Sequence, residues 1–125
     1  MSLTQTGWAC IASALIADAS YNAFDFTHAY LGVGDSSNAF VNSQTDLQGT
    51  SKKRVGMDSN YPSRASNVIT FRSTFATGDA NWQWNEDGIF NASTAGQMLT
   101  RAVETLITKT SAVSVVFTKT LTIQS

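Results

Sequence analysis

The stretch that decides the fold is the C-terminal run of residues 113–123, which reads VSVVFTKTLTI. Every second position but one carries an apolar side chain, and Ser or Thr fills most of the positions between. The apolar members are Val113, Val115, Phe117, Leu121 and Ile123. Because successive side chains of a β-strand point to opposite faces, this alternation predicts a long antiparallel strand with one buried and one solvated face.

Four stretches upstream show the same strand-like character. Residues 26–33 and 67–76 alternate in side-chain type and are predicted to be strands. Residues 81–90 and 97–104 flank the turn-forming stretch 91–96, NASTAG, which predicts a hairpin with a longer loop. We therefore expect five or six strands joined by turns.

Near the N-terminus the apolar period becomes that of a helix, which we expect over residues 7–19. The residues on its apolar face are Trp8, Ile11, Ala12, Leu15 and Ala19. We interpret Trp8 and Cys10 as core residues, since a free cysteine is usually a small buried hydrophobe. Because no crossover helices separate the strands, the chain is predicted to be mainly β. The expected fold is an antiparallel sheet or β-sandwich with one N-terminal α-helix packed against it.

The composition indicates one domain, residues 1–125, and excludes several kinds of site. Charged residues make up 14% of the chain, whereas Ser and Thr together supply 31 of 125 residues. A formal net charge of −1 gives no field that attracts phosphates, so no nucleic-acid partner is expected. The single cysteine, Cys10, and the single histidine, His28, exclude a disulfide framework and a Cys/His zinc site. We expect no metal and no cofactor.

The apolar run at residues 8–19 is too short to cross a bilayer, which needs about 20 apolar residues. No Lys or Arg precedes Lys52, so the run also lacks the basic start of a signal peptide. We expect a protein made in the cytoplasm without a membrane partner.

One short motif resembles a catalytic signature. Gly34-Asp35-Ser36 follows a predicted strand and resembles the start of the nucleophile block of GDSL esterases. A serine nucleophile needs a base, which in that family is a histidine near the C-terminus. The only histidine here, His28, lies upstream and within a strand pattern, so we interpret the motif as a turn and expect no catalytic residue.

Two further pairs of residues stand out on the predicted strand 81–90. Glu86 and Asp87 are adjacent, so their side chains point to opposite faces, and we expect a surface or loop role for them. Trp82 and Trp84 are two residues apart and share a face. They belong either to the core, to a subunit interface, or to a patch that stacks on sugar rings. Phe40 is a further aromatic residue that a neighbouring subunit is expected to cover.

The order of these segments resembles a known group of proteins. After the N-terminal helix, residues 30–35 (YLGVGD), 45–47 (TDL) and 53–54 (KR) resemble the N-terminal region of tail-collar fibre proteins of tailed bacteriophages. A second pattern is similar to one in small phage virion proteins. It consists of residues 67–75, then residues 86–92 (EDGIFNA), then residues 96–101 (GQMLTR). The resemblance covers nearly the whole chain, and each motif is a strand-and-turn signature.

The resemblance implies a non-enzymatic virion structural protein, a tail or collar fibre-type attachment or adaptor subunit on the tail or capsid surface. The long fibre proteins continue into a shaft and a receptor-binding tip, whereas this sequence ends at Ser125. We therefore expect a role in assembly and not in direct host recognition. The expected partners are further copies of the chain, with a trimer as the first hypothesis, and other virion proteins. Two alternatives stay open: a capsid decoration protein, and a carbohydrate-binding module that contacts host glycan through Trp82 and Trp84.

Overall fold

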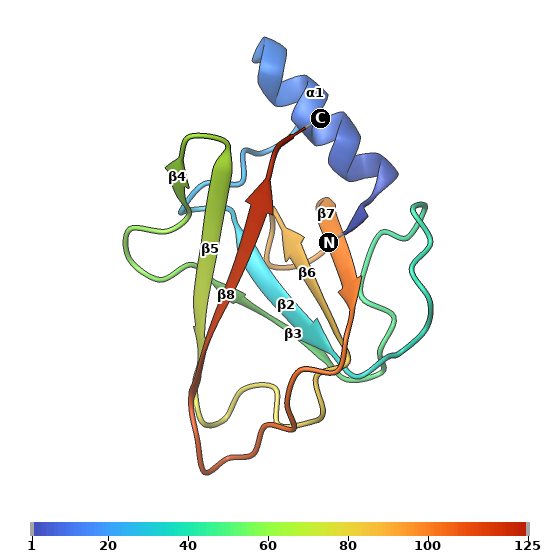
Figure 1. Cartoon of the computed structure of the whole chain (residues 1–125), viewed down its shortest axis with the longest axis vertical. Coiled ribbons are helices and arrows are strands. Elements are labelled where there is room, and N and C mark those ends of the chain that lie inside the picture. Colours follow the sequence, from blue (N-terminus) through green and yellow to red (C-terminus); the bar gives the residue numbers. More distant parts are fainter. Residues whose placement is uncertain (1, 125) are drawn as a thin grey trace.

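The computed structural model describes residues 2–124, which form two antiparallel sheets and one helix (Figure 1). The elements in chain order are β1 (Ser2–Leu3), α1 (Gln5–Ile16), β2 (Tyr30–Gly34), β3 (Lys52–Gly56), β4 (Ser63–Ala65), β5 (Val68–Phe75), β6 (Glu86–Phe90), β7 (Met98–Val103) and β8 (Val115–Thr122). One sheet has the order β1-β7-β6-β2-β3 and the other the order β4-β5-β8. The predicted fold class, mainly β with one N-terminal helix, is confirmed.

The two strongest strand patterns lie side by side in the smaller sheet. β8 runs antiparallel to β5 along its whole length, from Val115 opposite Phe75 to Thr122 opposite Val68. The predicted hairpin also forms, because β6 and β7 pair antiparallel around the loop at residues 91–97. The core lies between the sheets. Its main cluster of buried side chains is Ala29, Leu31, Phe71, Ile89, Leu99 and Leu121.

Two predicted strands begin later than their sequence patterns do. The first starts at Tyr30 instead of residue 26, because the backbone N–H groups of His28 and Ala29 donate to the Asp25 carbonyl in a tight turn. The second starts at Glu86 instead of residue 81. Residues 81–85 are irregular, and the Trp84 N–H there donates to the Ile107 carbonyl at 2.7 Å.

Helix α1 begins after Thr4, whose side-chain oxygen accepts a hydrogen bond from the Gly7 N–H at 2.8 Å. This is an ordinary N-cap. The helix ends at Ile16, because Ala17 adopts a left-handed conformation with φ of 53°. The predicted helix at residues 7–19 is thus real but begins two residues earlier and ends three residues earlier. No helix within residues 2–124 has the length and apolar character needed to span a membrane.

The face that α1 turns toward the sheet is the opposite of the predicted one. Gly7, Cys10 and Ser13 are the buried helix residues, whereas Trp8 is 60% exposed and Leu15 is 85% exposed. The prediction that Cys10 is a core residue is confirmed, and the same prediction for Trp8 is wrong. Small side chains on the inner face allow the helix to lie directly against β7. The larger apolar residues therefore face outward.

We expect Gly7→Ala to destabilise the protein by about 1–3 kcal/mol, although alanine favours helices over glycine by about 1 kcal/mol. An added Cβ would lie inside van der Waals distance of the Leu99 carbonyl oxygen, so α1 must move off β7. Urea unfolding followed by tryptophan fluorescence measures the loss. The matched control is Gly78→Ala, where a Cβ meets nothing within 4 Å. Equal stability of the Gly7→Ala protein and the wild type would contradict the packing described for α1.

Candidate functional site

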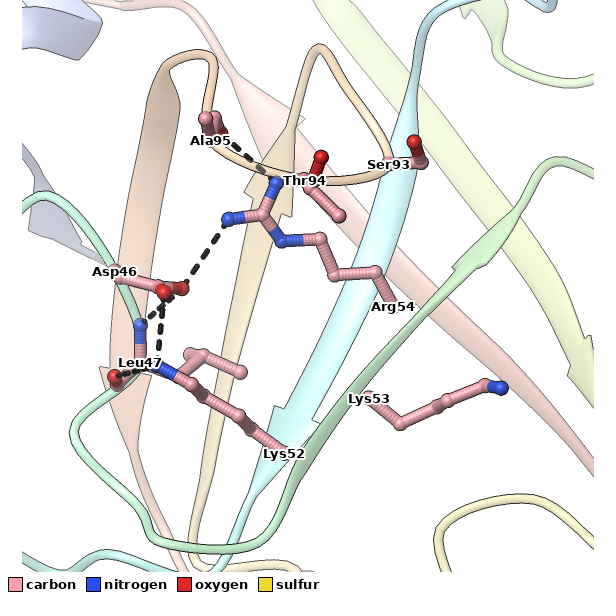
Figure 2. A pocket seen from close by; sticks show the side chains of 8 residues that line it. All are labelled: Asp46, Leu47, Lys52, Lys53, Arg54, Ser93, Thr94 and Ala95. Carbon is pink, nitrogen blue, oxygen red and sulfur yellow. Dashed lines mark hydrogen bonds and ion pairs between the residues drawn. The ribbon is translucent and has the colours of Figure 1, made fainter.

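A polar pocket of about 360 Å³ lies on the larger sheet, between the edge strand β3 and the loops at residues 46–47 and 93–95 (Figure 2). Its central group is the Arg54 guanidinium, which lies over the Phe90 ring at 3.6 Å from the ring centroid. Arg54 Nη1 donates to the carbonyl oxygens of Ala92 and Ala95, both at 2.9 Å, and Nη2 donates to Asp46 at 3.2 Å. The arginine therefore fastens the β6–β7 loop to β3.

The other basic residues of the run at 52–54 are also paired. Lys52 Nζ donates to Asp46 at 2.8 Å, and Lys53 points away from the pocket toward Asp79, at 3.6 Å (Figure 2). Burial raises the pKa of Asp46, but hydrogen bonds from Lys52, Leu47 and Arg54 outweigh this effect and lower the pKa overall. Because its two cations share one carboxylate and several carbonyls, the pocket is a loop anchor and carries little free positive charge.

A larger apolar groove of about 940 Å³ lies between α1, the segment at residues 19–24 and the ends of β5, β7 and β8. Ile11, Leu15, Phe24, Ile69 and Leu121 are among its walls. No charged side chain lines it. An occupant of this groove would therefore be uncharged and apolar.

The outer surface of α1 continues this apolar character. Trp8, Ile11, Ala12 and Leu15 lie on one face at spacings of three, four and seven residues, and we name them the outer stripe. Ile11 is half-buried beside the core, and the other three are exposed. The helix carries no charged residue. A contiguous apolar surface of this kind is typical of an interaction site.

Of the alternatives for Trp82 and Trp84, the structure shows the core for Trp84 and forms no patch of two tryptophans. Trp84 is 1% exposed and packs on the Phe75 and Phe117 rings, at centroid distances of 4.9 and 5.6 Å. Its indole N–H donates to the Ala80 carbonyl at 2.9 Å. Trp82 is half-buried against the same cluster. The reason is that residues 81–85 leave the strand conformation, so Trp84 enters the core and has no face available to a sugar ring.

Phe40 also lies apart from the tryptophans. It is half-buried in the long connection between β2 and β3. The three residues considered as interface or glycan contacts, Trp82, Trp84 and Phe40, therefore do not share one exposed surface, because Trp84 belongs to the core.

The Gly34-Asp35-Ser36 motif is a turn. Asp35 Oδ1 accepts a hydrogen bond from the Ser51 N–H at 3.2 Å, and Ser36 Oγ accepts one from the Asn38 N–H at 3.0 Å. His28 lies before β2, whereas Ser36 lies after it, and the histidine Nδ1 is 2.7 Å from Asp25. The structure therefore does not bring the serine and the histidine together.

The surface role expected for Glu86 and Asp87 is wrong, because both side chains are fully buried. Their predicted orientation toward opposite faces is correct, since each has its own partner. Glu86 lies 2.8 Å from Arg101 Nε, and Asp87 lies 3.2 Å from Lys119 Nζ. In a chain with few charges, a charge inside an apolar strand pattern is the signal that predicts such a buried pair.

The Glu86 carboxylate joins several parts of the chain. Oε1 accepts hydrogen bonds from Arg101 Nε and the Gln48 N–H, both at 2.8 Å. Oε2 accepts hydrogen bonds from the Gly49 N–H at 2.7 Å and the Ser36 N–H at 3.3 Å. A carboxylate with this many donors acts as a structural anchor, and here it fixes both ends of the β2–β3 connection to the sheet.

Asp87 has a different environment. Lys119 lies at ion-pair distance, but neither carboxylate oxygen of Asp87 receives a hydrogen bond, and Lys119 also binds Glu104 at 3.0 Å. Burial raises the pKa of Asp87 to about 7, in spite of the lysine. The hydrogen bond from Lys119 lowers the pKa of Glu104. The cluster joins β6 of one sheet to β8 of the other.

Within residues 2–124, no three His, Cys, Asp or Glu side chains gather as metal ligands do. Comparison with protein-family models, with curated proteins and with solved structures finds no match to this chain.

Proposed function

We propose that this chain is a non-enzymatic virion structural protein of a tailed bacteriophage, a tail or collar fibre-type subunit that assembles through further copies of itself. The observation that supports this proposal best is the outer stripe of α1. Trp8 and Leu15 remain largely exposed there, although a chain of this size gains stability from every large apolar residue it buries.

Burying a large apolar side chain yields about 1.5–3 kcal/mol, so a partner that covers the outer stripe gains several kcal/mol. The spacing of Trp8, Ile11 and Leu15 is that of the seam between packed helices. Because α1 carries no charge, identical helices approach one another without repulsion. We therefore propose a homotrimer in which three copies of α1 pack around one axis.

The polar side chains favour an assembly role over catalysis. Arg54, Glu86 and Arg101 each fasten loops to the larger sheet, and Ser36 holds a turn. The alternative of a carbohydrate-binding module loses its main support, because Trp84 lies in the core.

Leu15→Asn is expected to reduce the mass of the assembly in solution, because it replaces the most exposed large apolar side chain of the outer stripe by a polar one. Sedimentation velocity measures the mass, and urea unfolding verifies that the fold is retained. The matched control is Ile107→Asn, which makes the same kind of change at another exposed apolar residue, outside α1. An unchanged mass for Leu15→Asn would refute assembly through the outer stripe.

The virion role is tested by location. A label on the C-terminus is expected to appear on the tail or the capsid surface in negative-stain images of purified particles. Its absence from the particles would overturn the proposal. The number of copies relative to the major capsid protein separates the two placements, since capsid decoration requires far more copies than a tail subunit.

A further inference from the structure

The two sheets have four edge strands, and three of these carry features that prevent pairing with another chain. β1 is two residues long and β4 is three residues long. β3 carries Lys52, Lys53 and Arg54. Short length and positive charge are the usual means by which proteins protect a sheet edge.

The fourth edge, β8, has none of these protections. It is eight residues long, contains neither Pro nor Gly, and pairs with β5 without a bulge. Its only charged residue is Lys119, whose side chain is mostly buried and is paired with Asp87 and Glu104. Figure 1 shows β8 at the border of the smaller sheet, beside β5.

The pairing pattern identifies which backbone groups of β8 are free. The Ile123 N–H donates to the Asn67 carbonyl at 2.8 Å, directly after the last strand pair. Because hydrogen-bonded residues alternate along an antiparallel strand, the odd-numbered residues of β8 bond to β5. The even-numbered residues direct their N–H and C=O groups to the open edge. They are Val116, Thr118, Thr120 and Thr122, and all four are exposed.

We propose that β8 pairs antiparallel with β8 of a second copy of this chain across a two-fold axis. This contact joins two three-stranded sheets into one and satisfies the free backbone groups of both edges. It goes beyond the proposed function, because it uses a different surface from the outer stripe and does not require the chain to be a virion protein.

The distribution of exposed apolar residues favours a second copy in this orientation. Val113 lies just before the strand and Val116 near its start, and the two are 48% and 58% exposed, whereas Ile123 lies just after its end and is 50% exposed. Antiparallel pairing of identical strands about Lys119 brings the start of one against the end of the other, so Val115 lies opposite Ile123 on one face and Val116 lies opposite Thr122 on the other, at both ends. Thr118 and Thr120 then face each other near the axis, and cross-strand threonine pairs are favourable.

Charge does not oppose the contact. Lys119 lies at the centre of the strand, so a two-fold axis brings the two lysines near each other. Each ammonium is already paired with two carboxylates of its own chain, Asp87 at 3.2 Å and Glu104 at 3.0 Å. The copies therefore meet through uncharged side chains and backbone groups.

Thr118→Pro tests this proposal, because proline removes an N–H that points to the open edge and is not used within the fold. We perform the test in the Leu15→Asn background, where the α1 contact is absent. Sedimentation equilibrium is expected to show a dimer for Leu15→Asn alone. Adding Thr118→Pro is expected to weaken dimerisation about tenfold or more, since each copy loses one intermolecular hydrogen bond.

Two companion variants complete the test. Thr118→Ser keeps the N–H and is expected to leave the dimer intact. Thr120→Lys places a charge on the open edge and is expected to dissociate the dimer. This variant tests the β8 contact if the proline variant does not fold. A monomeric Leu15→Asn protein, or a dimer that both Thr118→Pro and Thr120→Lys leave unchanged while folded, would overturn the β8 contact. Neither result affects the test of the outer stripe or the labelling of particles.

Discussion

Glu86→Ala is expected to lower the free energy of unfolding by about 3–5 kcal/mol, a large share of the 5–15 kcal/mol that a typical domain has. The reason is that Arg101 stays in the core without its counter-ion. The backbone N–H groups of Gln48 and Gly49 also lose their acceptor, and these partly buried donors place the loss toward the upper end of the expected range. Urea unfolding followed by tryptophan fluorescence measures the loss, because Trp84 reports on the core.

Lys52→Met is the matched control for this loss. Lys52 forms an ion pair with Asp46 at the same distance of 2.8 Å, but both side chains are about two-fifths exposed. Exposed pairs contribute about 0–1 kcal/mol, so the control is expected to change stability by no more than this. A Glu86→Ala protein that loses no more stability than Lys52→Met would show that the buried pair has no structural importance.

The double variant Glu86→Leu/Arg101→Met separates the charge effect from the loop effect. Replacing both members of a buried ion pair by apolar residues is often neutral when the pair acts alone. Here the double variant is expected to recover only part of the lost stability, because Glu86 also accepts bonds from the loop amides and Arg101 donates to the Asn38 carbonyl. Full recovery would mean that the loop bonds contribute little.

Strand alternation predicts β5 and β8, the two long strands of the smaller sheet, and the turn-forming stretch at residues 91–96 predicts the β6–β7 hairpin. In residues 67–76 and 113–123, one face is buried and the other is solvated, so the period of two is visible in the sequence. Two charged residues on the inward-facing positions of strand patterns, the buried Glu86 and the mostly buried Lys119, are signals of the same kind. Each interrupts an apolar pattern, and each has an ionic partner on a neighbouring element.

The orientation of α1 could not be predicted from periodicity. An apolar stripe on a helix does not show whether the stripe packs on the same chain or faces outward. The orientation depends on which face of the helix packs more closely against β7. Gly7 allows close approach to the Leu99 backbone, and Thr4 N–H donates to the Leu99 carbonyl at 3.1 Å, so the small-residue face is held against β7. For Trp84 the sequence left the core, an interface and a sugar-binding patch open, because the pattern does not show that the backbone leaves the strand conformation at residues 81–85.

Asp87→Asn is expected to remove a fall in stability that the wild type shows as the pH rises from about 4 to about 7. Burial raises the pKa of Asp87 from 3.8 to about 7 in the folded protein, so the folded state holds a proton that the unfolded state has released. The folded state therefore gains stability from this group at low pH and loses it as the pH rises through 7. The expected loss is on the order of 4 kcal/mol, at about 1.4 kcal/mol for each of the roughly three pH units between the two pKa values.

Urea unfolding at a series of pH values compares the wild type with Asp87→Asn, and the difference between the two curves isolates Asp87 from every other group that titrates. Glu104→Gln is the matched control, because it removes the other carboxylate that Lys119 binds and leaves Asp87 buried. The Glu104→Gln protein is still expected to lose stability as the pH rises. The loss is expected to end at a lower pH than in the wild type, since Glu104 raises the pKa of Asp87. Parallel curves for the wild type and Asp87→Asn would mean that Asp87 titrates alike in the folded and unfolded chains. That result would contradict the effect of burial on this carboxylate, because loss of hydration is what raises its pKa against the attraction of Lys119.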